Sequence, residues 1–398
     1  MKALDGIRML DLTHMISGPF GSMILADLGM ETIKIETPGR GDITRRLSAH
    51  DPDYSVKGMG PYFLTNNRNK KSVTINLKST AGRALFYELV RVSDVVMNNF
   101  SAGVLERLQI SFEHLSPLNP RIITCSVTGY GETGPDRDRV AYDMAAQATS
   151  GIMSVTGQPG TPPTRLGVPV ADLNGGLLGA VGILSALVAR EMTGRGQHVD
   201  VSMLDSQISL LNYMATMYLI SGIVPGQIGN AHYMHVPYDT FPVADGYIIL
   251  AVVTDAFWQS LMGIVDTPDL DTEENARQPG RHKNRDHINT RLSEVLVTHT
   301  KQHWIAKLTA ARIPCAPVND FAQALSDPQV LARQMVVEVE HPEGGTVRIP
   351  GNPVKLSETH EETFSSPPLL GQHTDAVLRD LLGKSDEEIS GLRDQGVI

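Results

Sequence analysis

Asp172 has the clearest chemical context in this sequence. It is a single acid followed by Leu173, Asn174 and two glycines, and then by an apolar run from Leu177 to Ala189 in which only Ser185 is polar. This pattern predicts a helix that begins near Asp172 and is buried on every side. At about 16 residues the helix is shorter than the roughly 20 residues that a membrane span needs, so we expect no membrane partner.

Two roles are open to the Asp172 carboxylate. An acid at the start of a helix can accept hydrogen bonds from the first backbone N–H groups, and its charge suits the positive end of the helix dipole. A catalytic carboxylate can use the same place, because those N–H groups stabilise an oxyanion and small glycines let a substrate approach the backbone. The two roles are compatible.

Other catalytic signatures are absent from the sequence or lack their context. Gly129 to Gly134 fits the dinucleotide pattern G-x-G-x-x-G after an expected strand, but Pro135 and the charged run 136–139 replace the helix that should follow. The sequence has no Walker A loop, no G-x-S-x-G elbow and no H-E-x-x-H helix. These observations argue against a nicotinamide or flavin site, an NTPase, a serine hydrolase and a zinc protease.

The overall composition is that of a soluble enzyme of 398 residues. The net charge of -10 and the pI near 5.7 argue against nucleic acid as a main partner. Two cysteines, Cys125 and Cys315, offer neither a disulfide framework nor a metal site. The N-terminus has no signal-peptide pattern, so we expect a cytoplasmic protein.

The first part of the chain alternates strands and helices, which predicts an α/β fold with a mostly parallel, Rossmann-like sheet covered on both faces. Ligands of such sheets bind beyond the carboxyl ends of the strands. We expect a second, smaller α/β domain at 225–325. The expected strands are 7–13, 31–36, 72–77, 94–98, 121–128 and the run HVDVSMLDS at 198–206, and the expected helices are 19–29, 80–92, 103–115 and 205–221.

Several motifs in the same order and spacing resemble those of the class III CoA-transferase family. This CaiB–BaiF group includes formyl-CoA transferase and carnitine CoA-transferase. The likeness runs nearly end to end, and the chain is identified as a member of that family. The motifs are LDGIRMLDLTHMISGP, Gly41-Asp42, KSVTINLKS, SVTGYGETGP, ADLNGG, TGRGQHVDVSMLD, IPCAPVND and PLLGQHT.

The resemblance implies that Asp172 is the nucleophile of a CoA-transferase. CoA would move from an acyl-CoA donor such as succinyl-CoA to a carboxylic acid through mixed anhydrides and an aspartyl-CoA thioester. We expect a small dicarboxylate as acceptor, with Arg45, Arg46 and His14 lining the acceptor end. CoA thioesters would be substrates, and we expect no permanently bound cofactor and no metal.

The resemblance also assigns residues to CoA. Position by position, it places Ile16 and Ser17 near the thioester, Lys78 and Arg107 at the nucleotide end with Asn99 and Phe100 beside them, and Arg139 and Tyr142 close to the pantetheine. One departure lies after the strand 31–36, where the formyl-CoA members carry an arginine and this chain has Thr37 and Pro38. Whether Arg40 replaces that arginine stays open.

Two further departures narrow the function. The oxalate-using members have a glycine run in the small domain, and residues 229–238 of this chain lack it. Oxalate and formyl-CoA are therefore less favoured as substrates. An α-methylacyl-CoA racemase needs a His-Asp pair as second base. At that place the chain has Tyr142 and Asp143, and Tyr is a poor base because its pKa is about 10. The racemase and a non-catalytic acyl-CoA-binding protein remain as alternatives.

The resemblance further implies an interlocked homodimer whose active site lies between the large domain of one subunit and the small domain of the other. The large, CoA-binding domain would then combine residues 1–200 with the tail 326–398. Residues 201–224 would form a helix and linker to the small domain.

Overall fold

The computed structural model describes residues 1–359 and 363–398, which form two compact units. The first unit contains residues 1–152, 165–223 and 329–398, and the second contains 153–164 and 224–328. Two segments differ from the boundaries expected from sequence. Residues 153–164 lie with the second unit, and residues 201–223 lie with the first.

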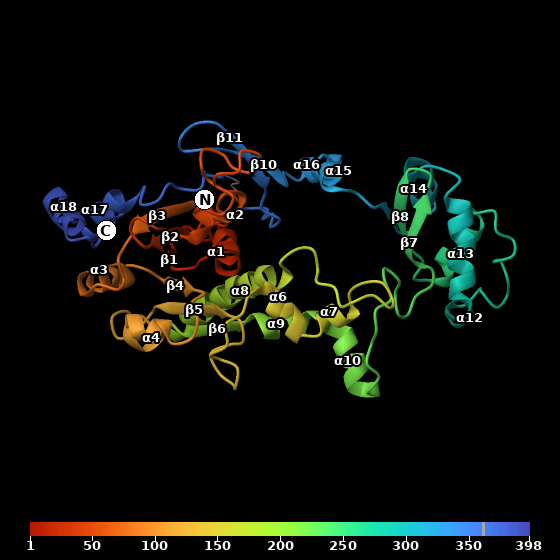
Figure 1. The fold of residues 1–398 in the computed structure, drawn as a ribbon, viewed down its shortest axis with the longest axis horizontal. Coiled ribbons are helices and arrows are strands. Elements are labelled where there is room, and N and C mark those ends of the chain that lie inside the picture. The colour runs from red at the N-terminus through yellow and green to blue at the C-terminus, as the bar shows by residue number, and fades with distance from the viewer. Residues whose placement is uncertain (360–362) are drawn as a thin grey trace. The chain divides into compact units, whose positions relative to one another are not determined.

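A six-stranded parallel sheet forms the centre of the first unit (Figure 1). Its strand order is β3-β2-β1-β4-β5-β6, so the order reverses between β1 and β4. Such a switch point leaves a crevice beyond the carboxyl ends of the strands. The strands are β1 (Arg8–Asp11), β2 (Glu31–Glu36), β3 (Lys70–Thr74), β4 (Val95–Asn98), β5 (Ile123–Thr128) and β6 (His198–Ser202).

Successive strand residues point to opposite faces of the sheet and contribute to two hydrophobic cores, one on each face. Leu10 and Val96 pack with helices α3 (Thr80–Arg91), α17 (Thr374–Leu382) and α18 (Asp386–Asp394). Met9 and Met97 pack with α1 (Ser17–Asp27) and α8 (Val170–Thr193). The parallel α/β sheet covered on both faces is therefore confirmed, because period-two burial on both faces requires helices on both sides.

Helix α8 differs from the sequence prediction in length and in burial. It has 24 residues and is long and apolar enough to cross a membrane by length and composition alone, so the expected length of about 16 residues was too short. One face packs on β5, β6 and α1 (Figure 1). The opposite face is exposed along Leu177, Val181, Val188 and Met192, so burial on every side was wrong.

Helices α1 and α8 cross in backbone contact. A Cβ on Gly176 would lie 2.0 Å from the carbonyl oxygen of Ser17, and one on Gly21 would lie 2.2 Å from the carbonyl oxygen of Gly176. Neither position has room for a side chain. The crossing fixes the start of α8 against the loop that leads from β1 into α1.

Several short elements complete the first unit. The expected helix 103–115 is two helices, α4 (Val104–Leu108) and α5 (Phe112–Leu115), and α9 (Met203–Leu210) is separated from α10 (Asn212–Ser221) at Leu211. The left-handed backbone of Gln109 and of Asn212 accounts for both interruptions. The remaining elements are the 3-10 turn Ile43–Arg45, α2 (Pro61–Asn66), α6 (Asp143–Thr149), and the hairpin β10 (Val336–Glu340) and β11 (Thr346–Pro350). Helix α7 (Ile152–Val155) begins at the last residue of the segment 1–152, and its other residues belong to the second unit.

The second unit has its own sheet and its own core. Strands β7 (Tyr238–Val243), β8 (Gly246–Ala251) and β9 (Cys315–Pro317) pair antiparallel, and Trp258 and Trp304 are buried among the helices packed on them. The helices in and after it are α11 (Asp255–Met262), α12 (Gln278–Lys283), α13 (Arg285–Leu296), α14 (Lys301–Ala310), α15 (Phe321–Leu325) and α16 (Pro328–Ala332).

Candidate active site

Asp172 is the third residue of α8. The N-cap position is Pro169, which makes no side-chain cap, so Asp172 is not the N-cap of its helix. In an α-helix the side chains of residues i and i+4 share a face. Asp172 therefore lies one turn before Gly176, on the face that crosses α1 at Ser17.

Asp143 caps the first turn of α8. Its Oδ1 accepts hydrogen bonds from the backbone N–H of Ala171 (2.8 Å) and of Asp172 (3.3 Å), and its Oδ2 accepts one from Gln147 Nε2 (2.7 Å). The N–H of Leu173 bonds to the Pro169 carbonyl at 3.0 Å. The first N–H groups of α8 are therefore engaged within the protein, and the expectation that they stabilise an oxyanion was wrong.

Burial, and then the charge of Asp143, raise the pKa of Asp172 to about 7. The carboxylate is half-buried, and no cation is hydrogen-bonded to it among the described residues. Perturbed carboxylates of this kind concentrate at functional sites, because a poorly solvated anion is a stronger nucleophile and base than a hydrated one.

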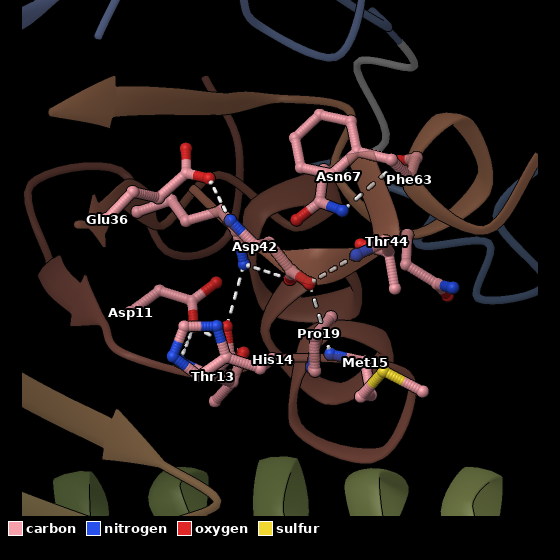
Figure 2. Close-up of polar contacts among 12 residues, drawn as sticks. Asp11, Thr13, His14, Met15, Pro19, Glu36, Asp42, Thr44, Phe63 and Asn67 are labelled. Carbon is pink, nitrogen blue, oxygen red and sulfur yellow. Dashed lines mark hydrogen bonds and ion pairs between the residues drawn. The ribbon is translucent and has the colours of Figure 1, made fainter. Parts of the chain in front are cut away.

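The loop from Thr13 to Ser17 rests on buried charges (Figure 2), and its Ser17 carbonyl lies against Gly176, one helical turn after Asp172. Lys34 Nζ donates to the Thr13 carbonyl at 2.7 Å and pairs with Asp42 Oδ2 at 3.0 Å, and both side chains are fully buried. Burial alone would raise the pKa of Asp42, but Lys34 and the Thr44 N–H hold it at about 2. Met15 in this loop has a left-handed φ of 67°, a conformation that the buried framework holds in place.

Two further ion pairs support the same loop. Lys70 Nζ contacts Asp11 Oδ2 at 2.9 Å and the Pro19 carbonyl at 3.1 Å, at the start of α1. Arg45 pairs with Glu36 through two bonds and lies over the Phe63 ring at 3.8 Å. Arg45 is thus committed to the framework, and the expectation that it lines the acceptor end was wrong.

A cationic pocket of about 370 Å³ lies at the sheet's switch point. It is called the nucleotide pocket below, after the end of CoA to which the family resemblance assigns Lys78. It brings the cations Lys78, Arg40 and Arg46 to one cavity with the rings of His14 and Phe100. Arg40 therefore shares a cavity with Lys78, as a replacement for the missing arginine requires. The remaining lining residues are Leu12, Ile35, Glu36, Thr37, Gly41, Ile43, Ile75, Asn76, Leu77, Val104 and Leu108.

The other expected CoA residues fall into three groups. Asn99 holds the loop, because its Nδ2 donates to the His14 carbonyl at 2.7 Å and to Ser17 Oγ at 3.3 Å. Arg107 is exposed on α4, between the lining residues Val104 and Leu108. Arg139 and Tyr142 are exposed, and Arg139 pairs with Asp136 and lies over the Tyr130 ring.

Ile16 lines a different cavity of about 510 Å³, called the apolar pocket below. This pocket lies between α1, α2 and the first turn of α8. Its lining is Ile16, Phe20, Met23, Ile24, Asp27, Pro61, Tyr62, Thr65, Asn66, Arg68, Val168, Pro169, Leu173, Met335, Pro350, Gly351 and Pro353. The loop 14–16 therefore separates the two pockets, with His14 on one side and Ile16 on the other.

Arg46 and His14 were expected at the acceptor end, and the structure places both in the nucleotide pocket. Sequence reasoning missed two other features: Lys34 and Asp42 form the buried pair beneath the loop, and Tyr62 lines the apolar pocket. The Gly41-Asp42 motif was a signal for the buried pair, although its pattern alone gives no partner. Among residues 1–359 and 363–398, no group of acids, histidines and cysteines is arranged to hold a metal ion.

Comparison with known proteins identifies the family. The sequence profile described as CoA-transferase family III matches residues 4–374. The chain belongs to this family. A CaiB/BaiF family protein from Brucella suis, known from its crystal structure, is 35% identical, with a TM-score of 0.85 over 96% of this chain and 99% of that chain. This family III chain is therefore a CoA-transferase with the CaiB/BaiF fold.

Relatives with assigned activities cover nearly the whole family III chain. An acetyl-CoA:oxalate CoA-transferase from Acetobacter aceti is 41% identical over 89% of this chain and 89% of that protein. The human succinyl-CoA:glutarate CoA-transferase is 37% identical over 100% of this chain and 90% of that protein. A succinyl-CoA:mesaconate CoA-transferase from Haloarcula marismortui is 37% identical over 95% of this chain and 96% of that protein.

Proposed function

We propose that this protein transfers CoA from an acyl-CoA donor, succinyl-CoA being the first choice, to a dicarboxylic acid, with Asp172 as the nucleophile. The observation that carries the proposal is the place of Asp172. This poorly solvated acid lies one helical turn before Gly176, which packs on Ser17 at the end of the loop that separates a cationic pocket from an apolar one. The names of the relatives support small dicarboxylates as acceptors.

The chemistry needs only carboxylates and a thiolate. The Asp172 carboxylate attacks the thioester carbonyl, the C–S bond breaks, and a mixed anhydride and CoA thiolate form. The thiolate then attacks the aspartyl carbonyl, which releases the donor acid as its carboxylate and leaves an aspartyl-CoA thioester. The acceptor carboxylate repeats both steps in reverse order and regenerates Asp172, so that no proton is gained or lost overall.

CoA would bind with its phosphates in the nucleotide pocket. Lys78, Arg40 and Arg46 supply positive charge there, and Phe100 and His14 offer flat faces to the adenine. Burial, and then Lys34, lower the pKa of His14, so its ring is neutral at pH 7 and adds no charge. Asn99 would act by fixing the loop that carries Ile16 and Ser17.

A homodimer is also proposed. The exposed face of α8 and the exposed apolar residues Leu219, Ile220 and Ile223 at the end of α10 are apolar surfaces of the kind that subunit interfaces bury. Sedimentation at micromolar concentration tests this directly. A monomer under those conditions would contradict it.

The function is tested by a CoA-exchange assay. Succinyl-CoA is mixed with glutarate, mesaconate or oxalate, and the new acyl-CoA is separated by chromatography and identified by mass. We expect exchange with at least one dicarboxylate and none with Asp172→Asn, which keeps the shape of the side chain but lacks the nucleophile. Unchanged exchange by Asp172→Asn would overturn the mechanism.

A further inference from the structure

The apolar pocket begins at the residues that flank Asp172. Val168, Pro169 and Leu173 form the wall on the α8 side, and Ile16 forms the wall beside the loop. The opposite walls come from α1 through Phe20 and Ile24. At about 510 Å³ the pocket falls within the range of small-molecule sites, roughly 300–1,000 Å³.

The loop 14–16 sets the direction in which a thioester would lie. In the proposed function, CoA bound at the nucleotide pocket approaches the loop from the side of His14, and its thioester carbonyl must reach Asp172, one helical turn before the contact of Gly176 with Ser17. The apolar pocket opens on the other side of the same loop, at Ile16. An acyl chain attached to a carbonyl at Asp172 therefore meets this pocket next.

The charged groups in the pocket wall are already satisfied. Arg68 bonds to both oxygens of Asp27, with its Nη2 at 2.7 Å from Oδ2, and also donates to the Pro350 carbonyl. Its side chain is only 1% exposed. Among the described lining residues, no further lysine or arginine is present, and the polar side chains that remain at α2 are Tyr62, Thr65 and Asn66.

We propose that the apolar pocket binds the carbon chain of the acid, both in the donor thioester and in the acceptor. The inference rests on the proposed function. The proposed substrates are acids with an aliphatic chain of several carbons. The far end of this chain would contact the uncharged side chains of Tyr62 and Thr65. Oxalate, which has no carbon between its carboxyl groups, would leave the pocket unfilled.

A chain-length series tests this assignment. Exchange from succinyl-CoA is measured for oxalate, malonate, succinate (isotope-labelled), glutarate and adipate, and for pentanoate beside glutarate. We expect kcat/KM to rise about fourfold for each methylene buried, until the pocket is full. Because Arg68 is paired with Asp27 and the described lining has no other cation for the far carboxylate, kcat/KM for pentanoate should lie within roughly tenfold of that for glutarate. A site that pairs this carboxylate with an arginine would exceed that difference.

Filling the pocket gives the complementary result. Thr65→Trp adds volume from α2, in a different element from Asp172 and from the nucleotide pocket. We expect the chain-length optimum to move to shorter acids, while acyl-CoA still labels Asp172. Unchanged acid preference would overturn the assignment. Dissociation of an oligomer together with unchanged preference would overturn it too, and would assign the pocket to a subunit contact.

Tyr62→Phe tests the far end of the acid and keeps the proposal falsifiable if Thr65→Trp does not fold. Loss of the hydroxyl should weaken glutarate several-fold and leave pentanoate unaffected, a difference that a purely structural effect would not produce. Tyr54→Phe, at a tyrosine that is 67% exposed and outside the pocket, is the matched control. Equal losses for both acids would overturn the proposal. The absence of any CoA exchange in the wild type would overturn the proposed function itself.

Discussion

Asp143 and Asp172 are joined by a hydrogen bond in which Asp143 Oδ1 accepts the backbone N–H of Asp172 at 3.3 Å. The acid that caps α8 is thus also the like charge that contributes to the raised pKa of the neighbouring carboxylate. Capping holds Asp172 in place, and its charge makes Asp172 harder to ionise. Position and reactivity of Asp172 are therefore coupled through one residue.

The first prediction concerns the pH dependence of the wild-type protein. Asp172 must be ionised to attack a thioester, and burial followed by the charge of Asp143 raises its pKa to about 7. We expect kcat/KM to fall about tenfold per pH unit below 7 and to level off above it. A profile that is flat between pH 5 and 8, measured by CoA exchange, would show that this ionisation does not limit the reaction.

Removal of the charge of Asp143 gives another prediction. Asp143→Asn keeps an oxygen for the N–H groups of α8, so the profile should shift to lower pH by the part of the pKa shift that Asp143 causes. The larger cause of the raised pKa, which is the burial of Asp172, remains in this variant. The new amide also opposes the Gln147 Nε2 donor, so a modest loss in melting temperature is expected. Asp380→Asn, at an exposed acid of α17, should change neither quantity.

The unliganded protein should be more stable without the Asp172 charge. The pKa of Asp172 in the folded protein, about 7, lies above that of an exposed aspartate, so its ionisation costs folding free energy that appears as pH rises from about 4 to 7. Asp172→Asn should therefore melt at a higher temperature than wild type at pH 8 and at nearly the same temperature at pH 4. A gap that is equal at both pH values would point to packing and not to charge.

The crossing of α1 and α8 predicts a strong effect for one methyl group. In Gly176→Ala the new Cβ would meet the Ser17 carbonyl at 2.0 Å, and a backbone atom cannot rotate away. We expect a melting temperature several degrees lower and a severe loss of exchange, because the start of α8 moves relative to the loop. Gly391→Ala is the control, since its Cβ meets nothing within 4 Å in α18, and alanine there should stabilise the helix by up to about 1 kcal/mol.

Local pattern was enough to predict the central sheet. The β-branched runs around Ile33 and Ile123 are strands buried on both faces, and both hold the places expected of them. The exposed face of α8 was not predictable in this way. Leu177 and Val188 are as apolar as the buried Ile183, and the sequence does not say which side of an apolar helix faces the rest of its own subunit.

The polar part of the site depends on long-range pairing that the sequence does not display. Asp143 and Asp172, which are hydrogen-bonded at the start of α8, are 29 residues apart in the sequence. Arg45 resembles a free cation in the sequence, because its ion pair with Glu36 forms only in the folded protein. Lys34 and Asp42 likewise become a buried pair only when β2 and the following turn fold together. The family resemblance assigned residues to ligand contacts, and the three-dimensional contacts show which of those side chains are already paired within the protein.

The most direct test of the account is covalent trapping of the nucleophile. The protein is mixed with succinyl-CoA and then with hydroxylamine or borohydride, digested, and mapped by mass spectrometry, with Asp172→Asn treated in parallel. We predict modification of the Asp172 carboxyl that requires the acyl-CoA and is absent from the variant. An unmodified Asp172 in a preparation that exchanges CoA, or modification at Asp143 instead, would contradict the central claim.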